Sequence, residues 1–110
     1  MTQTNKDVVL AFISAMDRGD AEAGARCLDP QAVTIAKGFG KLSGERRYDT
    51  IVGTLGAFRD LMPEGMNPTI HSVTAEADRV AVEFEGNATL VNGTPYCNQY
   101  CMVFTLRDGR

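Results

Sequence analysis

The spacing of the hydrophobic residues changes near the middle of the chain, and this change limits the possible folds more than any other feature. Up to residue 62, apolar side chains recur every three or four residues, which is the period of an amphipathic helix. From residue 68 onward they alternate with polar side chains, which is the period of a strand with one buried face. Helices followed by neighbouring strands predict an α+β fold, in which the helices pack on one face of an antiparallel sheet.

Several local signals place the ends of the elements in the first half. Thr4 and Asp20 are typical N-terminal helix caps, and Gly19 is a typical helix end. A short β-branched run over residues 32–36 predicts a strand, and the glycine-rich residues 38–44 predict a loop. The predicted helices span residues 5–18, 21–28 and 45–62.

The second half predicts a meander of three strands. Ala77-Asp78 forms the first tight turn and Asn92-Gly93 the second, and Asn-Gly is a strong signal for a short hairpin. The predicted strands span residues 68–76, 79–91 and 95–107. A further hairpin signal, Asp108-Gly109, is followed only by Arg110, so either the chain is truncated before the return strand or something else must cover the edge of the last strand. We expect dimerisation or strand exchange to protect the edge that this leaves free.

Composition and charge narrow the possible functions. A chain of 110 residues with 44% hydrophobic residues suits one domain over residues 1–110. The net charge of −3 and the scattered basic residues argue against a nucleic-acid partner. No apolar run is long enough to span a membrane, and the polar N-terminus predicts a cytoplasmic protein. The three cysteines argue against a disulfide framework.

The sequence has none of the patterns that hold common cofactors or metals. One histidine and dispersed cysteines give no zinc spacing, and we therefore expect no metal site. The glycines around residue 40 lack the rest of a dinucleotide-binding or phosphate-binding fingerprint. We expect a protein that works without a cofactor.

Strand alternation places three polar side chains on the face that the helices should cover: His71, Asn98 and Tyr100. A mostly apolar pocket with a few converging polar groups is the usual form of a small-molecule site. His71 is the one histidine of the chain and would serve as a general base. Tyr100 would donate a hydrogen bond to a developing oxyanion, and Asn98 would orient a carbonyl group.

Apolar and amphipathic side chains of the helices and strands would line this pocket around the polar groups. The predicted substrate-binding residues are Phe12, Met16, Tyr48, Phe58, Phe84, Asn98 and Met102. A structural interpretation stays open for each polar residue. His71 would then be an ordinary strand residue, Tyr100 a core residue with its hydroxyl bonded, and Asn98 a partner of nearby backbone.

Three segments resemble one family: Phe12–Asp20, Asp78–Gly86 and Tyr96–Phe104, with Arg107-Asp108-Gly109 after the third. They are similar to the first helix and two strands of SnoaL-like, ketosteroid-isomerase-related proteins of the nuclear transport factor 2-like superfamily. The resemblance implies a cystatin-like roll, in which a cone-shaped, curved antiparallel sheet holds three helices on its concave face. It also implies a deep pocket for a small apolar ligand, and often a homodimer through the outer face of the sheet.

The catalytic residues of the true steroid isomerases are not matched by this sequence. Their helix-one tyrosine corresponds to Phe12, and their general-base aspartate falls near Ala36. Their protonated aspartate falls near Cys101 or Met102. Steroid isomerisation is therefore not implied by the resemblance.

Two classes of function stay open at this point. The first is an isomerase, cyclase or hydrolase that uses acid–base chemistry on an apolar carbonyl or cyclic compound. The second is a non-enzymatic ligand-binding or dimeric assembly module. A pocket smaller than about 300 Å³ would favour the second class, because drug-sized ligands usually occupy larger cavities.

Overall fold

A computed structural model describes residues 4–36 and 44–110. The described residues form three helices and five strands: α1 (Asn5–Arg18), α2 (Ala21–Cys27), β1 (Val33–Ala36), β2 (Gly44–Arg47), α3 (Tyr48–Leu61), β3 (Thr69–Glu76), β4 (Arg79–Thr89) and β5 (Pro95–Thr105). No helix in this part of the chain is long and apolar enough to cross a membrane.

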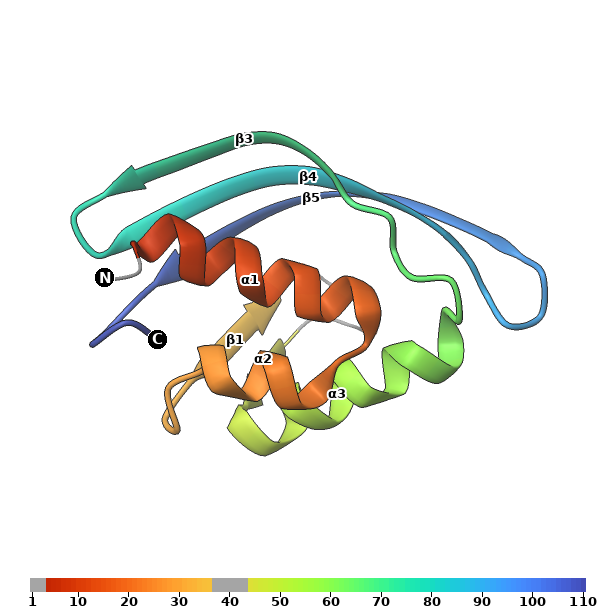
Figure 1. Ribbon diagram of the computed structural model, residues 1–110, viewed down its shortest axis with the longest axis horizontal. Helices are drawn as coiled ribbons and strands as arrows, with labels where there is room; N and C mark the ends of the chain where they lie inside the picture. The colour runs from red at the N-terminus through yellow and green to blue at the C-terminus, as the bar shows by residue number, and fades with distance from the viewer. Residues whose placement is uncertain (1–3, 37–43) are drawn as a thin grey trace.

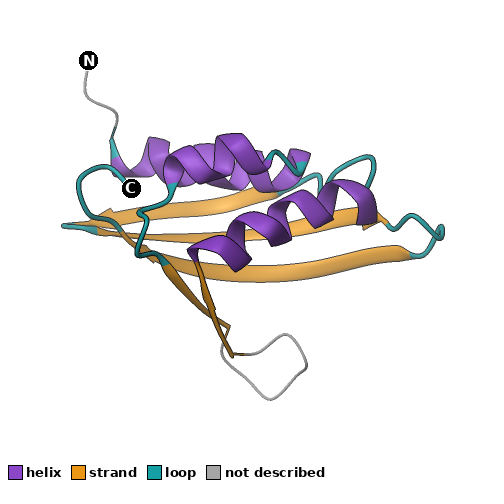
Figure 2. Ribbon diagram, turned by 90° about the horizontal axis from the view of Figure 1, so that it is seen from below, coloured by secondary structure: helices purple, strands orange, loops and turns teal. Residues whose placement is uncertain are grey.

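The strands of the second half form a curved antiparallel sheet in the order β3-β4-β5, and β1 and β2 form a separate two-stranded ribbon. All three helices lie on the concave side of the curved sheet (Figures 1 and 2). This arrangement confirms the predicted α+β fold. It also leaves two opposite sheet surfaces, which we call the concave face and the outer face.

The predicted helix ends are confirmed by their hydrogen bonds. The Thr4 hydroxyl accepts the backbone N–H of Asp7 at 3.2 Å, and the Asp20 carboxylate accepts the N–H of Ala23 at 3.0 Å. Each bond satisfies an N–H group that has no partner inside its helix. Gly19 ends α1 with a φ angle of +63°, a left-handed conformation that favours glycine.

The third helix starts later than predicted, because residues 44–47 form β2. This strand pairs in antiparallel fashion with β1, so that Val33 lies opposite Arg47. Gly44-Glu45-Arg46-Arg47 shows no apolar alternation, and its strand conformation comes from this pairing rather than from its own sequence pattern. The loop predicted over residues 38–44 lies almost wholly outside the described residues.

The core lies between α1, α3 and the concave face of the sheet. Phe12 of α1 meets Phe104 of β5 edge to face, with ring centroids 6.2 Å apart. The other side chains of the core cluster follow the helical and strand periods that the sequence predicts, except Met66, which lies in the connection between α3 and β3. They are Val8, Val9, Ile13, Met16, Ile51, Leu55, Met62, Met66, Val80, Val82, Phe84, Ala88 and Leu106.

The connection between α3 and β3 is fixed by the carboxylate of Asp17. Its Oδ1 atom accepts the backbone N–H groups of Met66 and Asn67, each at 2.8 Å. Asn67 in turn donates from its side chain to the carbonyl of Asn87 at 3.0 Å. These bonds hold the end of α1 against the start of the sheet, near the part of β5 that carries the candidate site.

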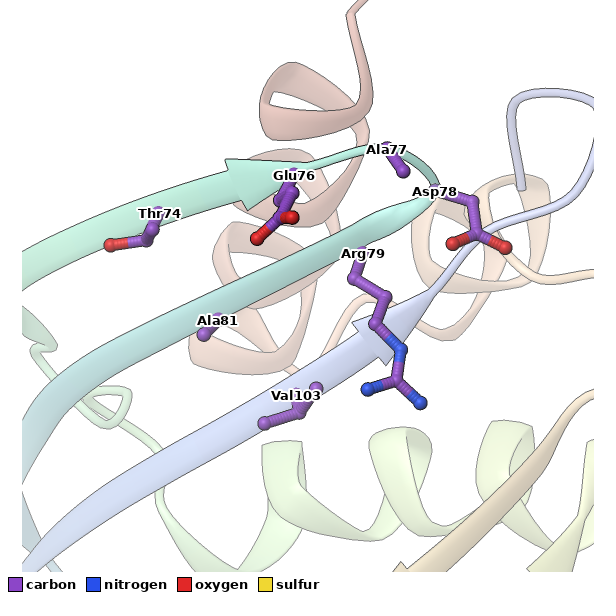
Figure 3. Close-up of a pocket in the computed structure, with 7 residues that line it drawn as sticks. All are labelled: Thr74, Glu76, Ala77, Asp78, Arg79, Ala81 and Val103. Atoms are coloured by element: carbon purple, nitrogen blue, oxygen red, sulfur yellow. The ribbon is translucent and has the colours of Figure 1, made fainter.

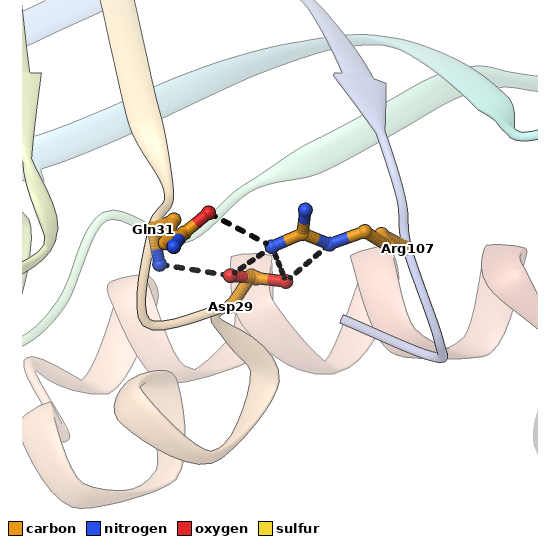
Figure 4. A network of polar contacts seen from close by, with 3 residues as sticks. All are labelled: Asp29, Gln31 and Arg107. Atoms are coloured by element: carbon orange, nitrogen blue, oxygen red, sulfur yellow. Dashed lines mark hydrogen bonds and ion pairs between the residues drawn. The ribbon is translucent and has the colours of Figure 1, made fainter.

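A second polar network ties the residues after β5 to the segment between α2 and β1. The guanidinium of Arg107 donates two parallel hydrogen bonds to Asp29, at 3.0 and 2.9 Å (Figure 4). The same guanidinium also reaches the side-chain oxygen of Gln31 at 3.3 Å. Two parallel bonds between a guanidinium and a carboxylate fix orientation as well as distance. They connect two segments that are far apart in the sequence.

Candidate functional site

Three polar side chains meet at the hairpin end of the concave face. Tyr96, Asn98 and Tyr100 project from the same side of β5 because residues two apart in a strand share a face. The hydroxyl oxygens of Tyr96 and Tyr100 lie 3.3 Å apart, and the Asn98 amide donates to the Tyr96 hydroxyl at 3.3 Å. We call these three residues the concave cluster.

Tyr100 is a half-buried member of the concave cluster. Its ring stacks on Phe84 with centroids 4.9 Å apart and an angle of 21° between the ring planes. Burial is the largest cause that raises the pKa of the phenol to about 12. Tyr100 is therefore protonated at neutral pH and can donate a hydrogen bond.

The structure places His71 on the outer face, away from Tyr100. His71 is the extra residue of a β-bulge, since Ile70 pairs with Phe84 and Ser72 pairs with the next residue, Glu83. Its Nε2 atom lies 3.4 Å from a carboxylate oxygen of Glu85, and 56% of its side chain is exposed. The prediction that His71 shares the concave face is therefore wrong, because the bulge interrupts the alternation on which it rested.

The predicted lining residues fall into two groups. Phe12, Met16 and Phe84 are buried in the core, where they pack against neighbouring side chains. The others remain partly accessible or exposed. Tyr48, Phe58, Tyr100 and Met102 are half-buried, and Asn98 is exposed. The second group defines the surface that a ligand on the concave side would meet.

Two hollows lie along the sheet away from the core. One, of about 410 Å³, is bounded by residues around the β3–β4 turn, including Thr74, Arg79 and Val103 (Figure 3). The other, of about 390 Å³, is bounded by Glu85, Cys97, Asn98 and Gln99. Neither is the helix-covered chamber that the sequence predicts. Their volumes therefore do not decide between the two classes of function.

One member of the concave cluster, Tyr96, is absent from the predicted site. Its spacing was the available signal, because Tyr96, Asn98 and Tyr100 follow one another at every second position of a strand. Across residues 4–36 and 44–110, no group of three or more His, Cys, Asp or Glu side chains is placed to hold a metal ion. The chemistry available at the cluster is hydrogen bonding by two phenols and one carboxamide.

Comparison with known proteins assigns the family. The model of the SnoaL-like domain matches residues 9–110. The chain belongs to the SnoaL-like family. This agrees with the resemblance of its first helix and its two long strands. No curated protein matches the sequence.

Solved structures similar to this SnoaL-like chain include proteins with different activities. An LEH-like epoxide hydrolase of M. tuberculosis superposes with a TM-score of 0.81 at 21% identity, covering 96% of this chain and 75% of the other. IdmH, a putative polyketide cyclase from Streptomyces antibioticus, gives 0.76 at 20% identity, with coverages of 98% and 86%. A protein of ketosteroid isomerase-like fold from Catenulispora acidiphila, in complex with trimethylamine, gives 0.77 at 14%, with coverages of 94% and 78%. At these identities the similarity establishes the fold.

Proposed function

We propose that this SnoaL-like protein binds a small, largely apolar organic compound on the concave face, against the concave cluster. The observation that carries the proposal is the convergence of Tyr96, Asn98 and Tyr100 beside the half-buried, apolar side chain of Met102. A few polar groups in an apolar setting are the usual composition of a ligand site. An epoxide hydrolase and a putative polyketide cyclase share the fold, which is compatible with a compound of this type.

The acid–base role that the sequence suggests for His71 does not follow from this geometry. His71 and Tyr100 lie on opposite faces of the sheet, and a general base must come within hydrogen-bond reach of the proton that it removes. The site that we propose therefore acts through Tyr100 and the residues bonded to it. Binding without chemical conversion is its simplest activity.

The test measures the binding of 2-acetylnaphthalene through the changes that it causes in the backbone amide NMR signals of the protein. We expect Y100A to weaken binding at least about tenfold, because it removes a ring and a donor from the site. H71A is the matched control and should bind like the wild type, because it changes the opposite face. Equal losses in both variants, or no loss in Y100A, would contradict the proposal.

A catalytic role for His71 is tested separately, by measuring turnover. Hydrolysis or isomerisation of epoxides and ketones by the wild type, abolished in H71A while binding persists, would favour the acid–base enzyme over the binding protein. Persistent turnover in H71A would exclude His71 as the base.

We propose further that a second copy of the chain covers the outer face of the sheet. None of the described helices packs on this face (Figure 1), and Val103 at its β5 edge is 62% exposed. Besides Glu83 and Glu85 of β4 and the charged residues beside the β3–β4 turn, its remaining side chains are mostly small or uncharged, which suits packing of one sheet against another. They include Ser72, Thr74, Ala81, Cys97, Gln99, Cys101 and Thr105.

A further inference from the structure

The hydrogen bonds of the concave cluster run in one donor-to-acceptor direction, which the Asn98 carboxamide sets. The Asn98 Oδ1 atom lies 2.9 Å from the backbone nitrogen of Gln99. A backbone N–H can only donate, so the side-chain atom facing it must be the oxygen of the carboxamide. The amide nitrogen is then left to face the Tyr96 hydroxyl at 3.3 Å, and it can only donate there.

The Tyr96 hydroxyl is therefore an acceptor toward Asn98. Its own proton is free to bond the Tyr100 oxygen, 3.3 Å away. A hydroxyl that accepts a hydrogen bond becomes a better donor, since hydrogen bonds in a chain polarise one another. The favoured order runs from the Asn98 amide to the Tyr96 oxygen, and from the Tyr96 hydroxyl to the Tyr100 oxygen.

In this order the proton of Tyr100 is not used inside the cluster. The ring of Tyr100 is held by its stack on Phe84, so the hydroxyl has a fixed position on the concave face. Burial raises the pKa of Tyr100, so the phenol keeps its proton through the whole physiological range in either order. The reverse order would direct the Tyr100 proton to Tyr96 and leave only lone pairs for a ligand.

We infer that Asn98 is a positioning residue that directs the Tyr100 hydroxyl outward as a donor, and that the ligand presents a neutral acceptor oxygen, such as that of a ketone. This inference rests on the proposed function, and it adds the ligand's chemistry and the role of Asn98. The hydroxyl contributes selectivity as well as affinity, because an apolar ligand of the same shape would leave it without a partner.

The experiment compares two ligands of equal shape, 2-acetylnaphthalene and 2-isopropenylnaphthalene, in which a CH₂ group replaces the oxygen. We expect wild-type protein to bind the ketone about tenfold more tightly than the hydrocarbon. Y100F should remove this preference, with both ligands retained. The infrared carbonyl stretch of the bound, ¹³C-labelled ketone should lie lower in the wild type than in Y100F.

Asn98→Asp tests the direction of the chain. A carboxylate cannot donate, so the Tyr96 hydroxyl would turn toward it and the Tyr96 oxygen would accept from Tyr100. We expect N98D to lose most of the preference for the ketone and to raise the carbonyl stretch, with unchanged thermal unfolding. A preference that persists in N98D would overturn the positioning role.

The remaining outcomes separate this inference from the proposed function. Equal affinity of the wild type for the ketone and the hydrocarbon would overturn the inference and leave the proposed binding site standing. Failure of both ligands to bind would overturn the proposed function, and the inference with it.

Discussion

Gly19 is the residue whose identity the fold requires most strictly. It combines a φ angle of +63° with a close approach to α3. A Cβ atom added at this position would lie 2.6 Å from the backbone nitrogen of Arg59 and 2.7 Å from its Cα atom. Backbone atoms cannot rotate away as the end of a side chain can. Any larger residue must therefore push α1 and α3 apart.

We predict that Gly19→Ala lowers the free energy of unfolding by about 2 kcal/mol or more, from the left-handed backbone and the contact with Arg59 together. The measurement is urea unfolding followed by circular dichroism. Gly53→Ala is the matched control, because a Cβ atom there meets nothing within 4 Å and Gly53 lies inside α3. The control should gain about 0.5–1 kcal/mol of stability. If Gly19→Ala lowers the free energy of unfolding by no more than Gly53→Ala changes it, the predicted clash with Arg59 is contradicted.

At the scale of elements, the contact between the α2–β1 connection and the end of β5 depends on pH. The backbone N–H of Gln31 and the guanidinium of Arg107 hold the pKa of Asp29 below its ordinary value of 3.8. A carboxyl group with a lowered pKa stabilises the fold above its unfolded pKa. That contribution is lost as the pH falls through the folded pKa. It is therefore complete at neutral pH and disappears in the acid range.

We predict that Asp29→Asn is less stable than the wild type at pH 7 and that the difference shrinks as the pH falls below 4. The measurement is the urea midpoint of both proteins between pH 7 and pH 2. Arg107→Gln should give the same trend with a smaller pH dependence, because the bond from Gln31 to Asp29 remains. A gap that stays constant across this range would show that Asp29 titrates alike in both states.

The elements also differ in how far their sequences predict them. Buried side chains at regular spacing mark α1 and β4, and both lie where that spacing puts them. The strand β2 lacks such a pattern, because its conformation comes from pairing with β1. The face of His71 was missed for a related reason. A single unpaired residue shifts the register, and nothing in the composition of Ile70-His71-Ser72 announces it.

At the scale of the whole molecule, the distribution of helices leaves the two sheet faces unequal. The distribution of apolar residues between the two faces of the strands was enough to predict which face the helices cover. Val82, Phe84 and Phe104 lie on that face. The concave cluster could be predicted in part, since alternation correctly placed Asn98 and Tyr100. What packs on the outer face depends on intermolecular contacts, which the periodicity of one chain does not encode.

We predict that Val103→Glu shifts the protein from dimer to monomer, measured by sedimentation equilibrium. A charged side chain placed within a sheet-to-sheet contact would lose its hydration when the two sheets pack together. Val91→Glu is the control, because Val91 is similarly exposed, at 69%, but lies in the β4–β5 hairpin. A monomeric wild type, or equal dissociation of both variants, would rule out the outer face as the contact.

The bulge in β3 decides which side chains at the start of this strand face the helices. If the ladder continued past Ser72 without the bulge, His71 would stand opposite Phe84, and Ile70 would stand opposite Glu85. Loss of the bulge with all residues kept would thus exchange an imidazole and an aliphatic chain between the outer face and the concave face. The insertion keeps a basic ring out of the helix-covered side and gives Ile70 the position beside Phe84.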